Sequence, residues 1–378
     1  MLSSFRMHHI VKFFHVYERE KGPLDYAMSL YFRANKACGS KDRAVISECV
    51  YTLVRWKKLY DAYLPKEKRN WEGRLSIYMD QPEAKKSLPL DVRVSCPTEF
   101  FEELVSDFGK ERAGELALIL NEKAPVSIRV NRGKISREEL FKLFQEKGFK
   151  VSLAEESPLG IIFHEKTNFF SLEEFKKGYF EVQDEASQLA ADLVVPKAGG
   201  RILDFCAGSG GKTLAFAYKT EGKGQIYLHD IRKKALFEAK KRLKRAGVQN
   251  GQIIHADEKE KLSKLKKKMD IVFVDAPCSG TGTYRRNPDM KWRFSKEGLL
   301  ELVGMQRMIF EQALSYVKPG GTIIYATCSL LKKENQEQVA HFLDHYPIKE
   351  DGELFQSLPD RGKKDGFFAV CFRKSDTV

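Results

Sequence analysis

Short apolar runs alternate with amphipathic segments through the second half of the chain, and this alternation constrains the fold more than any other feature. The segment 231–247 places leucine and alanine on one face and lysine largely on the others, which is typical of an amphipathic helix. Strands buried on both faces and separated by helices form parallel sheets, so the sequence predicts an α/β domain of the doubly wound kind. The expected strands are 201–205 (RILDF), 225–229 (QIYLH), 251–255 (GQIIH), 270–275 (DIVFVD) and 321–327 (GTIIYAT).

Two different patterns precede this domain. Residues 1–64 have helical periodicity without strand alternation, which predicts an all-helical module. A polar, proline-containing stretch over 65–97 predicts a linker or an irregular excursion of the chain. The residues after Pro97 combine helical stretches with alternating runs such as APVSIRVN, which predicts a compact α+β unit. The expected domains are 1–95, helical with the linker; 96–181, small α+β; and 182–378, α/β.

Composition limits the partners and the compartment. A total of 65 Lys+Arg against 52 Asp+Glu gives a net charge of +13, which favours a polyanionic partner. No run approaches the roughly 18 to 20 apolar residues of a membrane helix, so we expect a soluble protein without a membrane partner. The widely scattered cysteines favour a reducing cytoplasm, and we expect a monomer. The seven cysteines form no C-x-x-C pair, and the H-x-x-x-H pair of His341 and His345 has no third ligand nearby, so we expect no metal.

A glycine-rich loop follows the first expected strand of the α/β domain, with the sequence DFCAGSGGKT over 204–213. A phosphate-binding P-loop would need glycine where Cys206 stands, and the dinucleotide fingerprint would need glycine where Thr213 stands. An acidic residue at the strand end, Asp204, followed by a glycine turn instead indicates the loop by which methyltransferase-like sheets approach S-adenosylmethionine.

Two further carboxylates follow the next two strands. Asp230 ends the second strand about 20 residues on, where a carboxylate can accept both ribose hydroxyls, and Asp257 follows the third, placed for the adenine end. The alternative is that both residues only cap the helices that follow.

A cysteine follows each of the last two expected strands. Asp275-Ala276-Pro277-Cys278 comes after the fourth strand and Thr327-Cys328-Ser329 after the fifth. Because ligands of doubly wound sheets bind outside the carboxyl ends of the strands, both thiols should face the crevice of the glycine loop. The alternative is that both are small buried hydrophobic residues, the usual state of free cysteines.

Paired thiols suit methylation at carbon 5 of cytosine. This carbon is too weak a nucleophile to accept a methyl group directly, but addition of a thiolate across the 5,6 double bond converts it to an enamine that can. The reaction also needs an acid near N3, for which Asp275 is suited, and a base for the carbon-5 proton, for which Cys278 is suited.

The motifs around these residues resemble those of the RNA 5-methylcytosine methyltransferases of the NOL/NOP/Sun family. The likeness extends over nearly the whole chain, because APVSIRVN resembles the family's small RNA-binding domain and 39–64 resembles a NusB-type helical domain. It thus implies a Rossmann-like class I methyltransferase domain preceded by a NusB-like helical domain and a small α+β (RRM-like) domain. The motifs are 203–213 (LDFCAGSGGKT), 275–282 (DAPCSGTG), 284–292 (YRRNPDMKW), 325–329 (YATCS), 180–189 (FEVQDEASQL) and 365–374 (DGFFAVCFRK).

The resemblance implies a role for each matching residue. Cys328 would be the nucleophile on cytosine carbon 6, Cys278 would assist product release, and Lys212 would contact Asp275. The loop reads CAGSGGK where the family usually has CAAPGGK, so Gly208 and Ser209 would loosen it. The residues that would hold S-adenosylmethionine are Cys206, Ala207, Gly208, Ser209, Gly210, Gly211, Lys212, Asp230, Asp257 and Asp275.

Basic and aromatic residues are interleaved after Cys278, a composition suited to phosphates and unpaired bases. The likeness to bacterial members favours small-subunit ribosomal RNA as substrate, with transfer RNA as an alternative. A non-catalytic, NusB-like RNA-binding or antitermination factor and a methyltransferase of small molecules or proteins are the competing hypotheses. The expected RNA contacts are Arg285, Arg286, Lys291 and Trp292 in this loop, and Arg129 and Arg132 in the small domain.

Overall fold

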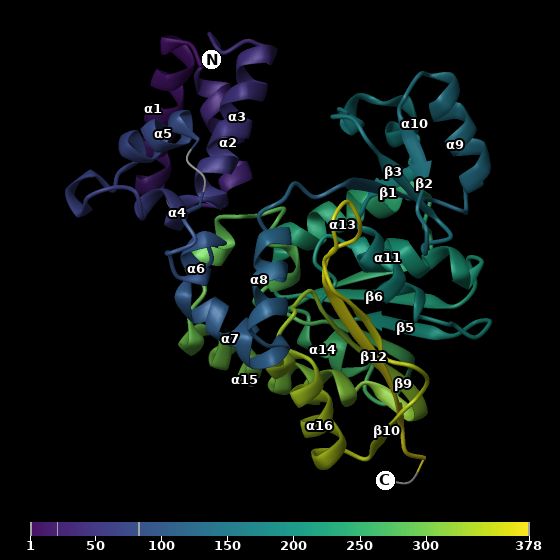
Figure 1. The fold of residues 1–378 in the computed structure, drawn as a ribbon. Helices are drawn as coiled ribbons and strands as arrows, with labels where there is room; N and C mark the ends of the chain where they lie inside the picture. The colour runs from purple at the N-terminus through teal and green to yellow at the C-terminus, as the bar shows by residue number, and fades with distance from the viewer. Residues whose placement is uncertain (1, 21, 82–83, 377–378) are drawn as a thin grey trace. The chain divides into compact units, whose positions relative to one another are not determined.

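A computed structural model describes residues 2–20, 22–81 and 84–376 of the chain (Figure 1). Two compact units divide it. The first, here called the helical unit, contains residues 1–123 together with 283–298, and the second contains 124–282 together with 299–378.

The helical unit packs around aromatic residues. Phe13 and Phe14 are buried, and the Phe14 ring stacks on that of Trp71 with 3.7 Å between centroids. Trp71 begins a helix inside the predicted linker 65–97, so the linker prediction is wrong for that part; Pro82 and Glu83 lie outside the described residues. The helices are α1 (Ser4–Glu20), α2 (Leu24–Ala34), α3 (Ser40–Arg55), α4 (Lys57–Asp61), α5 (Trp71–Asp80), α6 (Leu90–Arg93), α7 (Thr98–Phe108) and α8 (Lys110–Ile119).

The basic and aromatic segment 283–298 belongs to this helical unit. Lys291 is 2% exposed, and its Nζ donates to Arg55 O at 2.7 Å, Ser95 O at 2.7 Å and Asn121 Oδ1 at 2.5 Å. Burial lowers the pKa of Lys291 to about 7.

Two of the RNA contacts predicted in this segment are therefore wrong. Arg285 is fully buried, and the ammonium group of Lys291 donates its hydrogen bonds to acceptors inside the helical unit. Trp292 is half-buried and its Nε1 donates to Val54 O at 2.7 Å. These basic and aromatic side chains pack into the helical unit. Composition alone does not distinguish such a packed segment from an RNA-binding loop. The contact predicted for Arg286, which is half-buried, stays a prediction.

The second unit begins with a small domain, residues 124–182, built on an antiparallel sheet of order β2-β3-β1-β4. Phenylalanines, Phe144 and Phe180 among them, fill the space under this sheet. The N-terminus of α9 is fixed by a capping box between Ser136 and Glu139. The elements are β1 (Val126–Val130), α9 (Arg137–Glu146), β2 (Val151–Leu153), β3 (Gly160–Phe163), α10 (Glu173–Lys176) and β4 (Phe180–Val182).

The α/β domain follows and confirms the predicted parallel strands. The described strands form a sheet of order β10-β12-β9-β8-β5-β6-β7, in which β5 to β9 run parallel and β12 runs antiparallel to β9 (Figure 1). The order reverses between β5 and β8, and such a switch point is where doubly wound sheets bind ligands. The strands are β5 (Arg201–Asp204), β6 (Gln225–Asp230), β7 (Gly251–His255), β8 (Met269–Asp275), β9 (Val317–Thr327), β10 (Ile348–Glu350), β11 (Phe355–Ser357), paired with β12, and β12 (Phe367–Lys374).

Helices cover both faces of this sheet. Side chains of α11, α12 and α13 join one buried cluster, while side chains of α15 and α16 join the other, on the opposite face. On α13 the buried residues are Leu236, Ala239, Leu243 and Ala246, which are the residues that the helical periodicity predicts. The helices are α11 (Glu185–Asp192), α12 (Gly211–Phe216), α13 (Lys233–Ala246), α14 (Lys259–Ser263), α15 (Lys296–Leu314) and α16 (Gln336–His345).

Candidate active site

The two cysteines predicted to share a crevice lie against each other. Cys278 Sγ and Cys328 Sγ are 3.4 Å apart, within hydrogen-bonding range for sulfur. Because Asp275 pairs in register with Ala326, the loops after β8 and β9 leave the sheet at the same level. The hydrogen bond with Cys328, burial and the charge of Glu334 together raise the pKa of Cys278 well above its usual value. Cys278 therefore keeps its proton at neutral pH.

A buried carboxylate that the sequence analysis did not single out holds the two cysteine loops together. Glu334 is fully buried, and its Oε1 accepts from Ser279 N at 2.8 Å and from Gln306 Nε2 at 3.0 Å. Its Oε2 accepts from the hydroxyls of Ser279, at 2.5 Å, and Ser329. Each serine directly follows one of the two cysteines, so a single side chain fixes both loops. Glu334 stands in a polar stretch, KKENQEQ, that reads as the start of a solvated helix, and no spacing in the sequence marks it.

The loop 206–211, here called the cofactor loop, turns on two glycines with positive φ. Gly208 has φ +53° and Gly210 has φ +78°, a conformation that residues with a Cβ rarely adopt. Gly208 N donates to Asp230 Oδ2 at 2.8 Å, and Arg232 donates to both carboxylate oxygens of Asp230. Burial opposes ionisation of Asp230, but these hydrogen bonds outweigh it and hold its pKa below the usual value. Asp230 is thus an ionised acceptor beside the glycine turn, the kind of group that ribose hydroxyls bind.

The other predicted carboxylates differ in their surroundings. Lys212 Nζ lies 2.8 Å from Asp275 Oδ2, the contact that the family resemblance implied, and 4.4 Å from the centre of the Phe367 ring. Asp257 is exposed and pairs with Lys233 Nζ at 2.8 Å on the surface. The structure thus brings Asp230 and Asp275 to residues of the loop and of α12, while Asp257 stays outside this set of hydrogen bonds.

Asp204, at the end of β5, points into the protein. It is fully buried, its Oδ2 accepts from Thr213 Oγ1 at 2.6 Å, and its Oδ1 has no hydrogen-bond partner among the described residues. Burial raises the pKa of Asp204 to about 7. Its role is therefore to shape the turn between β5 and α12.

The pKa of Asp204 predicts a pH dependence of stability. A carboxyl whose pKa is raised on folding stabilises the fold below the unfolded pKa, and this contribution is lost as the pH rises through the folded pKa. Between about pH 5 and pH 8, Asp204 should lower the free energy of unfolding by roughly 3 kcal/mol. Asp204→Asn should remove this decline. Urea unfolding of the unmodified protein and of the variant at about pH 5 and about pH 8 measures this decline. An equal change in the free energy of unfolding of the two proteins would contradict the prediction.

The two arginines predicted to contact RNA from the small domain have different positions. Arg129 is 3% exposed and donates to Gly211 O at 3.1 Å, so the predicted phosphate contact is wrong: the side chain faces the cofactor loop instead of solvent. Arg132 is exposed, with its guanidinium 6.0 Å from the centre of the Tyr218 ring, and its RNA contact stays a prediction.

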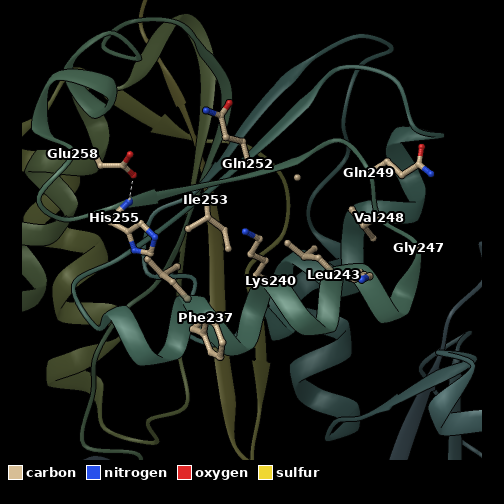
Figure 2. A pocket seen from close by; sticks show the side chains of 13 residues that line it. Phe237, Lys240, Leu243, Gly247, Val248, Gln249, Gln252, Ile253, His255 and Glu258 are labelled. Carbon is tan, nitrogen blue, oxygen red and sulfur yellow. Dashed lines mark hydrogen bonds between the residues drawn. The ribbon is translucent and has the colours of Figure 1, made fainter.

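A groove of about 740 Å³ lies between α13 and the edge strand β7 (Figure 2). Phe237, Lys240, Ile253 and His255 line it, with Glu258 Oε2 accepting from His255 N at 2.8 Å. Its lining includes neither cysteine and no residue of the cofactor loop, so this groove is separate from the candidate site.

Two family models match the chain. Residues 191–373 match the model described as 16S rRNA methyltransferase RsmB/F, and residues 96–169 match that of the ferredoxin-like domain of RsmF/B-like methyltransferases. Ribosomal RNA small subunit methyltransferase B of Proteus mirabilis is 33% identical over 258 residues, which cover 67% of this chain and 60% of that protein. The chain therefore spans about 60% of the length of this relative.

Solved structures match the fold. The crystal structure of PH0851 has a TM-score of 0.83 over 99% of both chains at 24% identity. That of a methyltransferase homolog protein from Pyrococcus horikoshii has a TM-score of 0.67 at 27% identity, covering 75% of this chain and 97% of that one. These likenesses confirm the predicted Rossmann-like and small α+β domains, and the helical unit is consistent with a NusB-like domain. Among the described helices, none has the length and apolar character of a membrane span.

Proposed function

Because the α/β domain of this chain belongs to the RsmB/F methyltransferase family, we propose that the protein transfers a methyl group to carbon 5 of a cytosine in small-subunit ribosomal RNA. The observation that carries the proposal is the 3.4 Å contact between Cys278 Sγ and Cys328 Sγ at the ends of β8 and β9. Methylation of an exocyclic nitrogen or of a hydroxyl needs no nucleophile of the enzyme, whereas carbon 5 does.

S-adenosylmethionine is the cofactor of this family, and the cofactor loop fits it. The turn at Gly208 and Gly210 lets the backbone approach a ligand closely, and Asp230 offers a charged acceptor to the ribose hydroxyls. We assign the remaining contacts to 206–212 and Asp275, with Asp257 at the adenine end. When bound, this cofactor supplies an electrophilic methyl group.

The two thiols divide the work on the base. The Cys328 thiolate adds to carbon 6, the electron pair of the 5,6 double bond shifts toward N3, and a proton held near Asp275 neutralises it. Carbon 5 then accepts the methyl group, a base removes the carbon-5 proton, and the electrons of that C–H bond expel the Cys328 thiolate. N3 releases the proton that it took up, which gives the neutral methylated base. Because Cys278 keeps its proton at rest, it can donate a hydrogen bond to Cys328 Sγ. Cys278 can take the carbon-5 proton only after its own proton has passed to solvent, and as a thiolate of high pKa it is then a strong base.

Release of tritium from carbon 5 tests the position of methylation. With ribosomal RNA carrying tritium at carbon 5 of cytosine, we expect one tritium released for each methyl group transferred. The same RNA labelled at carbon 5 of uridine is the control and should release none. Methyl transfer without tritium release would place the methyl group on another atom. Transfer to transfer RNA alone would change the substrate, and binding of RNA without any transfer would favour a non-catalytic RNA-binding factor.

A further inference from the structure

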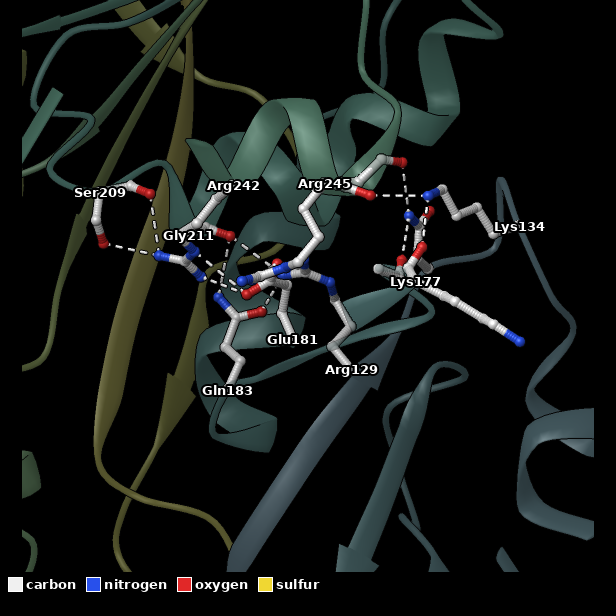
Figure 3. A network of polar contacts seen from close by, with 12 residues as sticks. Arg129, Lys134, Lys177, Glu181, Gln183, Ser209, Gly211, Arg242 and Arg245 are labelled. Carbon is white, nitrogen blue, oxygen red and sulfur yellow. Dashed lines mark hydrogen bonds and ion pairs between the residues drawn. The ribbon is translucent and has the colours of Figure 1, made fainter. Parts of the chain in front are cut away.

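An ion-pair network joins the small domain to α13 (Figure 3). Glu181 of β4 is 5% exposed and receives two arginines from α13. Its Oε2 accepts from Arg242 Nε and an Arg242 terminal nitrogen at 3.2 and 3.0 Å, and its Oε1 accepts from Arg245 at 2.5 Å. Charge-assisted hydrogen bonds of this kind fix the orientation of the guanidinium.

Arg242 also reaches the cofactor loop. The terminal nitrogen that does not contact Glu181 donates to Ser209 Oγ at 2.7 Å and to Ser209 O at 3.0 Å. Ser209 lies between the two glycines with positive φ, and its side chain is exposed. A residue flanked by two glycines has many accessible backbone conformations, so ordering it for a ligand carries a large entropic cost. Arg242 holds this residue in one place before any ligand binds.

The small domain also contacts the cofactor loop directly. Arg129 of β1 donates to Gly211 O at 3.1 Å, and Gln183, which follows β4, donates to the same oxygen at 3.3 Å. Figure 3 shows Gln183 and Arg129 together with Gly211 in the same network. The loop is therefore bonded to the small domain directly at its end, through Gly211, and indirectly at its centre, where Arg242 of α13 links Ser209 to Glu181.

We propose that Arg242 is a positioning residue for the cofactor loop, and that the small domain, through Glu181, sets the affinity of the α/β domain for S-adenosylmethionine. Glu181 orients the guanidinium, and the guanidinium in turn orders Ser209. By linkage, a partner that reseats the small domain on α13 changes cofactor affinity, and the cofactor changes the affinity for that partner by the same factor. This inference does not depend on which RNA atom is methylated.

Calorimetric titration with S-adenosylhomocysteine, which needs no turnover, tests the proposal on the full chain. We expect Arg242→Gln and Glu181→Gln each to weaken binding about tenfold, and Ser209→Ala to weaken it about threefold, consistent with loss of a charge-assisted hydrogen bond at a partly exposed site. The double variant Arg242→Gln with Ser209→Ala should lose no more than Arg242→Gln alone, because both changes break one contact.

Arg245→Gln is the matched control, since Arg245 contacts Glu181 from the same helix, whereas the bonds to Ser209 come from Arg242. It should leave the affinity within about twofold of the unmodified protein. Thermal unfolding checks that every variant is folded. If Arg242→Gln or Glu181→Gln does not fold, Ser209→Ala, which changes an exposed side chain, still tests the proposal. Full affinity in Arg242→Gln and Ser209→Ala would overturn the positioning role. Full affinity in Glu181→Gln alone would overturn the part assigned to the small domain.

Discussion

Cys328→Ala is expected to abolish methyl transfer, with a loss of at least about three orders of magnitude in rate. Without the thiolate at carbon 6, carbon 5 remains too weak a nucleophile for the methyl group. The same variant should form no covalent complex with RNA containing 5-fluorocytosine, because the captured species is the Cys328 adduct itself. Denaturing electrophoresis of protein with labelled RNA measures capture directly.

Cys278→Ala is expected to give the opposite electrophoretic result. Loss of the group that assists product release should let the adduct with ordinary RNA accumulate, while net turnover falls. Cys371→Ala is the matched control, since Cys371 lies on β12, outside the cysteine pair, and should behave like the unmodified protein. If Cys328→Ala still forms the adduct and Cys278→Ala does not, the two roles are reversed.

The parallel strands and the meeting of the two cysteines could be predicted because both follow from local pattern and general topology. Buried parallel strands read as continuous apolar runs, and β6 and β7 begin at the predicted residues. The carboxyl ends of parallel strands meet at one edge of the sheet, so Cys278 and Cys328 had to be neighbours once the strands were placed.

The positions of several charged residues could not be predicted, because they depend on partners far away in the sequence. Lys291 is satisfied by acceptors contributed by three other segments, and Arg129 by Gly211, 82 residues away. A lysine or arginine in a basic loop reads as solvated unless those acceptors are known. The burial of Glu334 is hidden for the same reason: its donors come from the two cysteine loops and from α15.

Replacement of the buried Glu334 is expected to have the second large effect, on both stability and adduct formation. Glu334→Ala should lower the free energy of unfolding by about 3 to 5 kcal/mol, because it leaves a cavity and removes the acceptor of Ser279 N, Gln306 Nε2 and two hydroxyls. Without the hydrogen bonds to Glu334, the two cysteine loops should no longer hold the thiols of Cys278 and Cys328 at a fixed distance. We therefore expect adduct formation with 5-fluorocytosine RNA to slow about 100-fold at a temperature where the variant is folded.

Glu334→Gln separates this positioning role from a general loss of stability. Its amide oxygen can still accept from Ser279 N and Gln306, and its amide nitrogen can donate to the serine hydroxyls once they rotate, so it should recover most of the adduct rate. Glu337→Gln, an exposed change on α16, is the control and should match the unmodified protein. Affinity for S-adenosylhomocysteine should stay within about twofold in all three variants, because the hydrogen bonds of Glu334 go to the cysteine loops and α15 and leave the cofactor loop untouched. Equal losses of adduct rate and of cofactor affinity in Glu334→Ala would mean that the carboxylate supports the whole domain and has no particular role at the cysteine pair.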